Sequence, residues 1–342
     1  MKKICFNFLA LLAFLTSCEN KEVVFPDYEY QSTYFAYQYP VRTLTLGEDI
    51  VDTSLDNQRR VKIMATTGGV YDNKKDVTVD FTVDNSLTQG ILFDQNGTAV
   101  KAMPSNYYKL ASNKIVIPAG KLIGGVEVEL TPEFFADPLA LQNNYVIPLR
   151  MTNVVNADTI LSGKPLVQNA KRGVAGEWSV LPKDFILYAV KYINPWHGFY
   201  LRRGKDEIKG KNGDTSLDQT LVRQQQYVEL DEVVKLTTQS LSKIDFPVVY
   251  KDKDGKNINV NLILTFDEQG NITVSSNSTE YTVTGSGKFE KRGEKNSWGN
   301  VDRDAIYLNY TVDFANMQIK STDTLVMRNR GVAFETFSPV VQ

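Results

Sequence analysis

Residues 258–266 read INVNLILTF, and this alternation of apolar and polar side chains sets the architecture expected for the second half of the chain. Apolar residues at every second position predict a β-strand with one buried and one solvated face. A turn signal at 267–271 leads into a further apolar strand at 272–274, and the alternation returns at 306–314. Sequential strands joined by short turns form an antiparallel meander, and a meander of about eight strands can close and remove its edges.

The last predicted strands of this meander are 324–327 and 332–337, with Asn329-Arg330-Gly331 as the turn between them. We therefore expect residues 171–342 to form a lipocalin-like β-barrel. A second β-sandwich is the alternative that the pattern leaves open.

The first half is also predicted to be β. Residues 77–83 and 126–130 alternate in the same way, and a short helix is expected at 131–136 after Thr131 and Pro132. About seven short strands separated by turn residues indicate an immunoglobulin-like sandwich over residues 34–170. The segment 153–176 is rich in Asn, Gly and Pro, so the domain boundary is placed near residue 170.

The N-terminus carries the pattern of a bacterial lipoprotein signal peptide. Lys2 and Lys3 precede an apolar run, and Leu15-Thr16-Ser17-Cys18 fits a lipobox. We expect residues 1–17 to be removed, Cys18 to be acylated and residues 18–33 to form a tether. The protein would then be held at the outer membrane by lipid, facing the cell exterior. An ordinary secretory signal or a buried N-terminal strand are the alternatives.

Composition excludes several functional classes. Without residues 1–17 the chain has 36 Lys and Arg, two fewer than the full 38, against 40 Asp and Glu, so no nucleic-acid partner is expected. Cys5 leaves with the signal peptide and Cys18 is expected to be acylated, which leaves no disulfide or thiolate metal site. His197 is the only histidine, so we expect no metal site and no cofactor.

Paired acidic residues raise the question of glycoside hydrolysis, which uses two carboxylates at a fixed separation. Each pair lies beside glycine, lysine or asparagine, and we interpret all of them as solvated turn acids. We therefore expect no catalytic residue and no enzyme activity. The pairs are Asp302 with Asp304, Asp252 with Asp254, and Asp206 with Glu207.

A binding function is better supported by the aromatic residues of the second half. The apolar face of a sugar stacks on a flat aromatic ring, while its hydroxyls need polar partners held in place. Trp196, His197, Tyr200 and Arg202 lie together in sequence, and Trp298 lies in a polar segment without strand alternation. These five residues are the predicted glycan-binding residues, with burial of the rings in the core as the alternative.

Two sets of motifs resemble known families. Residues 117–120, 126–128 and 145–150 resemble the N-terminal immunoglobulin-like domain of unknown function, the 1735 class, of lipoproteins from Bacteroidetes glycan-utilisation loci. Residues 194–204 and 322–331 resemble a C-terminal domain of unknown function, the 5627 class, that often follows it. The resemblance covers most of the mature chain and establishes no catalytic residue.

The resemblance implies a cell-surface or periplasm-facing lipoprotein that helps to capture a glycan. Its expected partners are a glycan ligand, the membrane through the lipid anchor, and an outer-membrane glycan transporter complex. A structural or adhesin-like subunit that contacts partner lipoproteins or a transporter is the second hypothesis. An accessory role beside a glycoside hydrolase, or a weak glycosidase activity, is the third.

Overall fold

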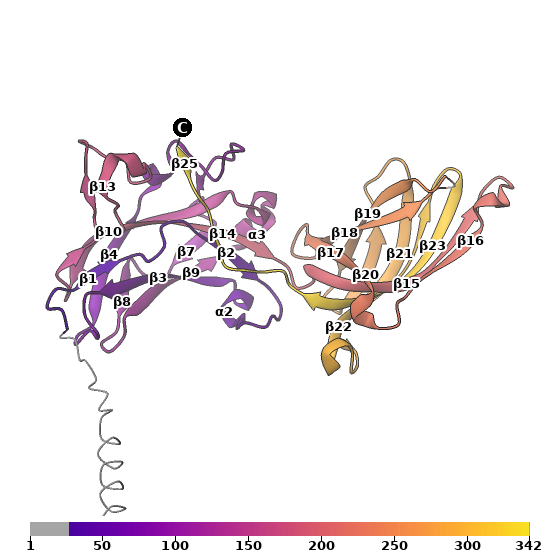
Figure 1. Cartoon of the computed structure of the whole chain (residues 1–342), viewed down its shortest axis with the longest axis horizontal. Coiled ribbons are helices and arrows are strands. Elements are labelled where there is room, and N and C mark those ends of the chain that lie inside the picture. Colours follow the sequence, from indigo (N-terminus) through magenta and orange to yellow (C-terminus); the bar gives the residue numbers. More distant parts are fainter. Residues whose placement is uncertain (1–26, 253, 342) are drawn as a thin grey trace, which may run out of the picture.

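The computed structural model describes residues 27–252 and 254–341, which form two β domains placed end to end (Figure 1). A β-sandwich comes first and a closed antiparallel barrel follows, which confirms the predicted fold class. The predicted signal peptide, Cys18 and tether residues 19–26 lie outside the described residues. Within the described ranges no helix has the length and apolar character needed to cross a bilayer.

The sandwich packs two sheets face to face. The first contains β1 (Ser32–Tyr34), β3 (Arg60–Gly68), β7 (Tyr108–Leu110), β9 (Ile123–Leu130) and β11 (Thr159–Ile160). The second contains β2 (Pro40–Thr45), β4 (Val77–Val83), β6 (Lys101–Ala102), β8 (Lys114–Ile117), β10 (Tyr145–Val155), β14 (Phe185–Ile193) and β24 (Glu335–Thr336). Alternate side chains of both sheets, such as Ile63 of β3 and Val79 of β4, are fully buried between them.

Short elements complete the sandwich and its loops. Two small ladders pair β5 (Ile91–Leu92) with β25 (Val340–Val341) and β12 (Lys164–Pro165) with β13 (Trp178–Val180). The helices here are α2 (Ser54–Asn57), α3 (Pro132–Ala136), η2 (Asn85–Thr88), η3 (Pro138–Leu141) and η4 (Ala175–Glu177). The helix predicted at 131–136 corresponds to α3.

The barrel is a meander that closes on itself. Its strands are β15 (Gly198–Gly210), β16 (Gln219–Arg223), β17 (Glu232–Thr238), β18 (Lys243–Lys251), β19 (Asn257–Phe266), β20 (Asn271–Ser275), β21 (Thr282–Glu294), β22 (Arg303–Asp313) and β23 (Met317–Asn329). Pairing of β23 with β15 closes the ring, and β16 adds a hairpin partner to β15. Three single-turn helices lie in the loops, η5 (Thr215–Leu217), η6 (Val228–Leu230) and η7 (Trp298–Asn300).

The strand at 258–266 behaves as its alternation predicts. It forms most of β19, and Val260, Leu262, Leu264 and Phe266 all point into the barrel core. The solvent-exposed face of the same strand carries Asn259 and Asn261. Side chains therefore fill the interior of an eight-stranded ring, as is typical of a barrel of this size.

The domain boundary lies further along the chain than the predicted position near residue 170. Strand β14 pairs with β10 and runs parallel to β2, so residues 171–193 complete the sandwich and the barrel begins after Asn194. The Asn-, Gly- and Pro-rich residues 156–176 do not link the domains, because they form β11, β12 and η4 at an end of the sandwich.

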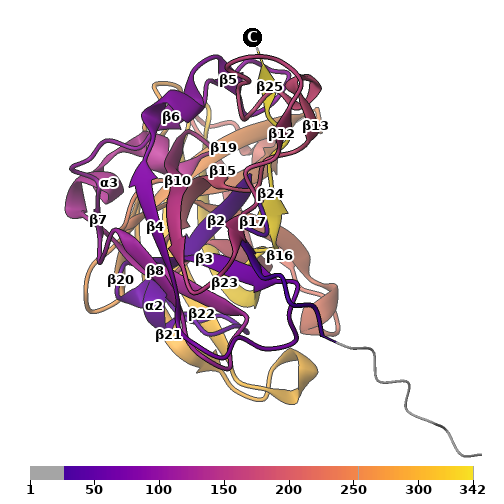
Figure 2. The same cartoon turned by 90° about the vertical axis from the view of Figure 1, so that its left-hand side faces the viewer.

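The C-terminus also departs from the prediction, since residues 332–337 are not the last barrel strand. The chain leaves the barrel after Asn329, β24 pairs with β2, and β25 pairs with β5 of the sandwich. In the end-on view both yellow strands lie beside the sandwich (Figure 2). Phe337 is buried there against Tyr39 and Phe93, and this apolar contact explains why the segment returns.

Candidate functional site

Arg330 holds the junction of the two domains. It is buried, and its guanidinium donates hydrogen bonds to backbone carbonyls on both sides. Two acceptors belong to the sandwich loop, Leu46 at 3.0 Å and Glu48 at 2.9 Å. The other two are Asn194 at 2.6 Å and His197 at 2.8 Å, where the barrel begins. One arginine therefore fixes the entry and the exit of the barrel against the sandwich.

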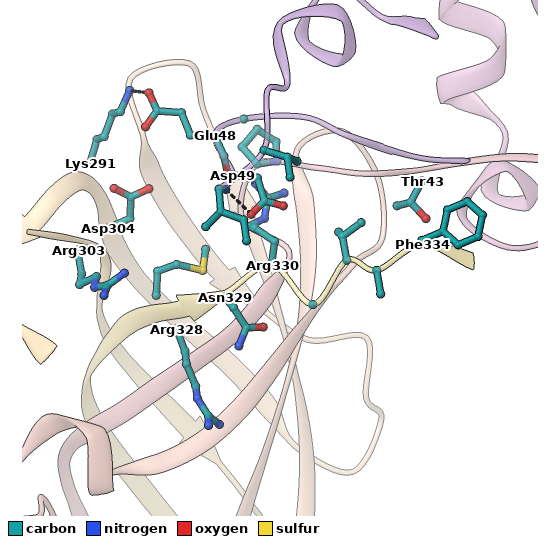
Figure 3. Close-up of a pocket in the computed structure, with 18 of the residues that line it drawn as sticks. Thr43, Glu48, Asp49, Lys291, Arg303, Asp304, Arg328, Asn329, Arg330 and Phe334 are labelled. Atoms are coloured by element: carbon teal, nitrogen blue, oxygen red, sulfur yellow. Dashed lines mark hydrogen bonds and ion pairs between the residues drawn. The ribbon is translucent and has the colours of Figure 1, made fainter. Parts of the chain in front are cut away.

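An open cleft of about 660 Å³ lies beside this junction (Figure 3). One wall is the sandwich loop 47–51 with strand β2, and the other is formed by the ends of β21, β22 and β23. The exit segment 329–334 runs along it. A concave site of this size at a domain interface is where ligand sites are most often found.

An exposed aromatic pair borders the cleft on its sandwich side. Phe334 has 73% of its surface exposed and Tyr37 has 56%, with ring centroids 5.2 Å apart. Phe334 also lines an apolar groove of about 310 Å³ next to the cleft, together with Met64 and Tyr188. Single exposed apolar side chains are common on protein surfaces. Several of them gathered at a surface hollow mark a contact site.

Charged groups lie along the barrel side of the cleft. Lys291 pairs with Glu48 across the two domains, and this hydrogen bond lowers the pKa of the Glu48 carboxyl. Asp304 accepts a hydrogen bond from the backbone N–H of Arg292 at 2.8 Å. Arg328 is exposed on the same side.

Trp298 is the predicted site residue that lies nearest to this charged edge. Its half-buried ring carries the guanidinium of Arg303 at 3.5 Å from the ring centroid, and its indole N–H donates to the Met327 carbonyl at 3.2 Å. Arg303 and Met327 both line the cleft. The ring therefore supports a cation at the edge of the cleft.

Trp196 has a different role from the predicted one. Its ring stacks on Phe266 with centroids 3.8 Å apart and planes 12° apart, and Phe289 meets it edge-on. The indole nitrogen is buried and finds no hydrogen-bond partner among the described residues. Trp196 therefore closes the end of the barrel core.

His197 lies at the junction with its Nδ1 facing the barrel. This nitrogen accepts a hydrogen bond from the Thr238 N–H at 3.1 Å, so it has no free lone pair for a proton. Burial, with the nearby charges of Arg330 and Lys235, lowers its pKa to about 4. The imidazole is therefore neutral at physiological pH and acts as a structural acceptor.

The structure corrects the prediction that Tyr200 and Arg202 form a surface with Trp196. Tyr200 has 0% of its surface exposed and donates its hydroxyl to the Trp196 carbonyl at 2.9 Å. Arg202 has 2% exposed and points into the barrel. The reason is the strand period, because both residues occupy inward positions of β15.

Arg202 belongs to a buried ion cluster inside the barrel. It pairs with Asp323 at 3.1 Å, and Arg223 of the hairpin strand bridges Asp323 and Asp206, each at 2.7 Å. Tyr310 donates to Asp323 at 2.8 Å. Burial alone would lower the pKa of Arg202, but the negative charge of Asp323 outweighs this effect. The pKa of Arg202 is therefore raised. The cluster is satisfied by its own members, so it serves the fold.

The acidic pairs separate into two groups. Asp302 and Asp252 accept backbone N–H groups in turns, from Asn296 at 3.0 Å and Lys256 at 2.8 Å, as predicted. Asp206 was predicted to lie in a turn and instead lies inside the barrel on β15. Among the described residues no group of three or more His, Cys, Asp or Glu side chains is placed to hold a metal ion.

The comparisons with known proteins agree with this division of the chain. Residues 195–331 match the family described as a domain of unknown function, DUF5627, and these bounds coincide with the barrel. Residues 28–158 match a family described as an N-terminal domain. A crystal structure of a Bacteroides ovatus protein of unknown function is 47% identical, with a TM-score of 0.88 over 92% of this chain and 100% of that chain.

The chain belongs to the same family as this Bacteroides ovatus protein. The matches identify a two-domain Bacteroidetes protein of unknown function, which confirms the predicted resemblance. A Bacteroides ovatus multidomain protein that includes DUF1735 is 11% identical, with a TM-score of 0.40 over 89% of this chain and 97% of that one. An auxiliary nutrient binding protein from Bacteroides thetaiotaomicron is 12% identical, with a TM-score of 0.38 over 86% and 95%. No curated protein matches the chain.

Sequence reasoning missed the residues that make the cleft. Phe334 lies in a segment that alternates like a strand, and Glu48 lies in a loop of the first domain. Tyr37, which lines the neighbouring groove, lies in another loop of that domain. The available signals are the aromatic residues Phe334 and Phe337 in a strand-like tail and the turn residue Gly331 before it. Neither indicates which domain the tail rejoins.

Proposed function

We propose that this family member captures a glycan in the cleft between its two domains and does not transform it. The observation that carries the proposal is the exposed Phe334–Tyr37 pair at the edge of an open cleft of about 660 Å³. Flat exposed rings suit the apolar faces of sugars, and the polar side chains of the opposite wall suit their hydroxyls.

The barrel interior is a weaker candidate for the same role. The apolar side chains of the barrel strands fill its interior, and Trp196 closes the end that faces the sandwich. The polar positions are occupied by Arg202, Asp323 and their partners. A ligand would have to break a satisfied ion cluster in order to enter.

The absence of catalysis is part of the proposal. A glycosidase needs a general acid whose pKa is raised, beside a second carboxylate at a defined separation. The acids at this cleft are Glu48, Asp49 and Asp304. Glu48 is paired with Lys291 and its pKa is lowered, which is the opposite of what a general acid requires.

Attachment of the protein to the cell surface is also proposed, and it is supported by the sequence Leu15-Thr16-Ser17-Cys18. Acylation of Cys18 would hold the cleft outside the outer membrane, where a glycan transporter complex could receive the ligand. Cys18→Ala should leave the protein without lipid, as measured by detergent partitioning and mass spectrometry of the mature N-terminus. A mature wild-type protein that starts at another residue without lipid would contradict the anchor.

The glycan proposal is tested by an array of neutral and acidic polysaccharides probed with the purified full-length chain. Phe334→Ala removes a stacking surface of about 1 kcal/mol, so binding should weaken about fivefold or more. Tyr227→Ala is the matched control, because Tyr227 is 55% exposed and lies in the connection between β16 and β17, outside the cleft. No binding to any glycan, or equal binding by wild type and Phe334→Ala, would overturn the proposal.

A further inference from the structure

The charges around the cleft differ in sign from those of the whole chain. The chain has 38 basic and 40 acidic residues. Five basic and three acidic side chains line the cleft, and these are Arg42, Lys291, Arg303, Arg328 and Arg330 with Glu48, Asp49 and Asp304. A basic hollow on an acidic protein concentrates anions locally.

Three of the five cations are already matched by the protein. Lys291 pairs with Glu48, and Arg42 pairs with the buried Asp56 of α2. Arg330 donates to four backbone carbonyls at the junction. These three groups stabilise the cleft and have little capacity left for a ligand.

Arg303 and Arg328 form no ion pair with any described residue. Arg303 uses its Nε to donate to the Trp298 carbonyl at 3.2 Å, and its two terminal nitrogens make no hydrogen bond within the described part of the chain. Arg328 is exposed and makes none there either. Both therefore keep the paired N–H groups through which a guanidinium donates two hydrogen bonds to an oxyanion.

Both arginines lie at the cleft end of adjacent barrel strands and line the cleft. Ala305 of β22 lies opposite Val326 of β23 in an antiparallel pair. Arg303 is the first residue of β22 and Arg328 the second-last residue of β23, so the two arginines lie on adjacent strands at the same end of the barrel. Figure 3 draws both guanidinium groups on the barrel side, away from the Lys291–Glu48 pair.

We infer that the glycan bound in this cleft is acidic and that Arg303 and Arg328 bind its anionic group. This inference rests on the proposed function. The group is a carboxylate, as in a uronic acid, or a sulfate ester, because both present the planar or forked oxygens that two guanidinium groups bind. Trp298 holds Arg303 in position before the ligand arrives.

The test titrates the full-length chain with three polymers, polygalacturonate, dextran sulfate and neutral dextran, at low and at moderate salt. The variants are Arg328→Gln and the double variant Arg303→Gln with Arg328→Gln. Arg150→Gln is the control, since Arg150 is a half-exposed arginine on β10 of the sandwich that does not line the cleft. Thermal melts of each variant check the fold, and Arg328→Gln leaves the Arg303–Trp298 stack untouched.

We expect an acidic polymer to bind, the double variant to weaken binding about tenfold or more, and added salt to weaken wild-type binding. The polymer that binds identifies the anion as carboxylate or sulfate. Equal binding of an acidic polymer by wild type and both variants would overturn the inference. Neutral dextran binding that depends on Phe334, with no gain from acidic groups, would overturn it and leave the proposed function standing. Binding of none of these polymers or of the array glycans would overturn both.

Discussion

Trp196 and Trp298 lie near the same end of the barrel and have opposite surroundings. The ring of Trp196 rests on Phe266 in the core, and its N–H has no partner among the described residues. The ring of Trp298 rests under the guanidinium of Arg303, and its N–H is donated to the Met327 carbonyl. The stack of Trp196 on Phe266 closes the end of the barrel core. The contact of Trp298 with Arg303 holds a positive charge at the edge of the cleft. The partner, and not the residue type, decides the role.

The largest effect is expected at Trp196. Trp196 is partly buried and its ring packs on the barrel core, so Trp196→Ala should leave a cavity and lower the free energy of unfolding by about 3–5 kcal/mol. Trp196→Phe keeps the stack on Phe266 and removes an N–H that lacks a partner, so it should cost less than about 1.5 kcal/mol. Denaturant titrations of the three proteins measure both values. Equal stability of wild type and Trp196→Ala would mean that Trp196 is not part of the core.

A smaller effect is expected from the histidine beside Trp196. The pKa of His197 falls from 6.5 to about 4 because the ring is buried, so between these values the unfolded chain binds a proton that the folded chain does not. Stability should therefore fall as the pH drops from about 6.5, by about 3 kcal/mol at pH 4.

The carboxylates of the chain also titrate in this range, so the measurement needs a matched variant. His197→Gln keeps an acceptor near the Thr238 N–H and does not titrate. Denaturant titrations from pH 7 to pH 4 should show a steeper loss of stability in wild type than in this variant. Parallel curves for the two proteins would show that His197 is not held neutral by the fold.

The smallest effect on stability is expected at Trp298. Trp298→Ala removes a cation–π contact and one hydrogen bond, which together contribute about 1 kcal/mol or slightly more. Binding of an acidic polymer should weaken about fivefold, because Arg303 is no longer held in place. Trp178→Phe serves as the control, since Trp178 lies in the sandwich ladder with β12. A loss of several kcal/mol in Trp298→Ala would place this ring in the core and remove the contrast with Trp196.

The sequence was sufficient for the strands and insufficient for the site. Alternation at 258–266 and 77–83 reports burial of one face, and the structure has strands there. Alternation also gives the inward positions of β15, but it does not reveal that the charges of Arg202 and Asp206 balance each other inside a barrel. That balance depends on Asp323 and Arg223, which are distant in sequence.

The same limit explains the misplaced boundary and tail. Strand β14 looks like a local continuation of a breaker-rich segment, yet its partners β10 and β2 come from much earlier in the chain. Residues 332–337 have the pattern of a strand, and their pairing with β2 depends on where Phe337 finds an apolar neighbour. The cleft is made by these long-range pairings, and a single sequence contains no direct signal for them.

The most direct test of the central claim is a crystal structure of the full-length chain with an oligosaccharide cut from the polymer that it binds most tightly. We expect sugar density in the cleft, with one ring against Phe334 and an anionic group between Arg303 and Arg328. Density inside the barrel, or on an outer face that shares no residue with the cleft, would contradict the claim.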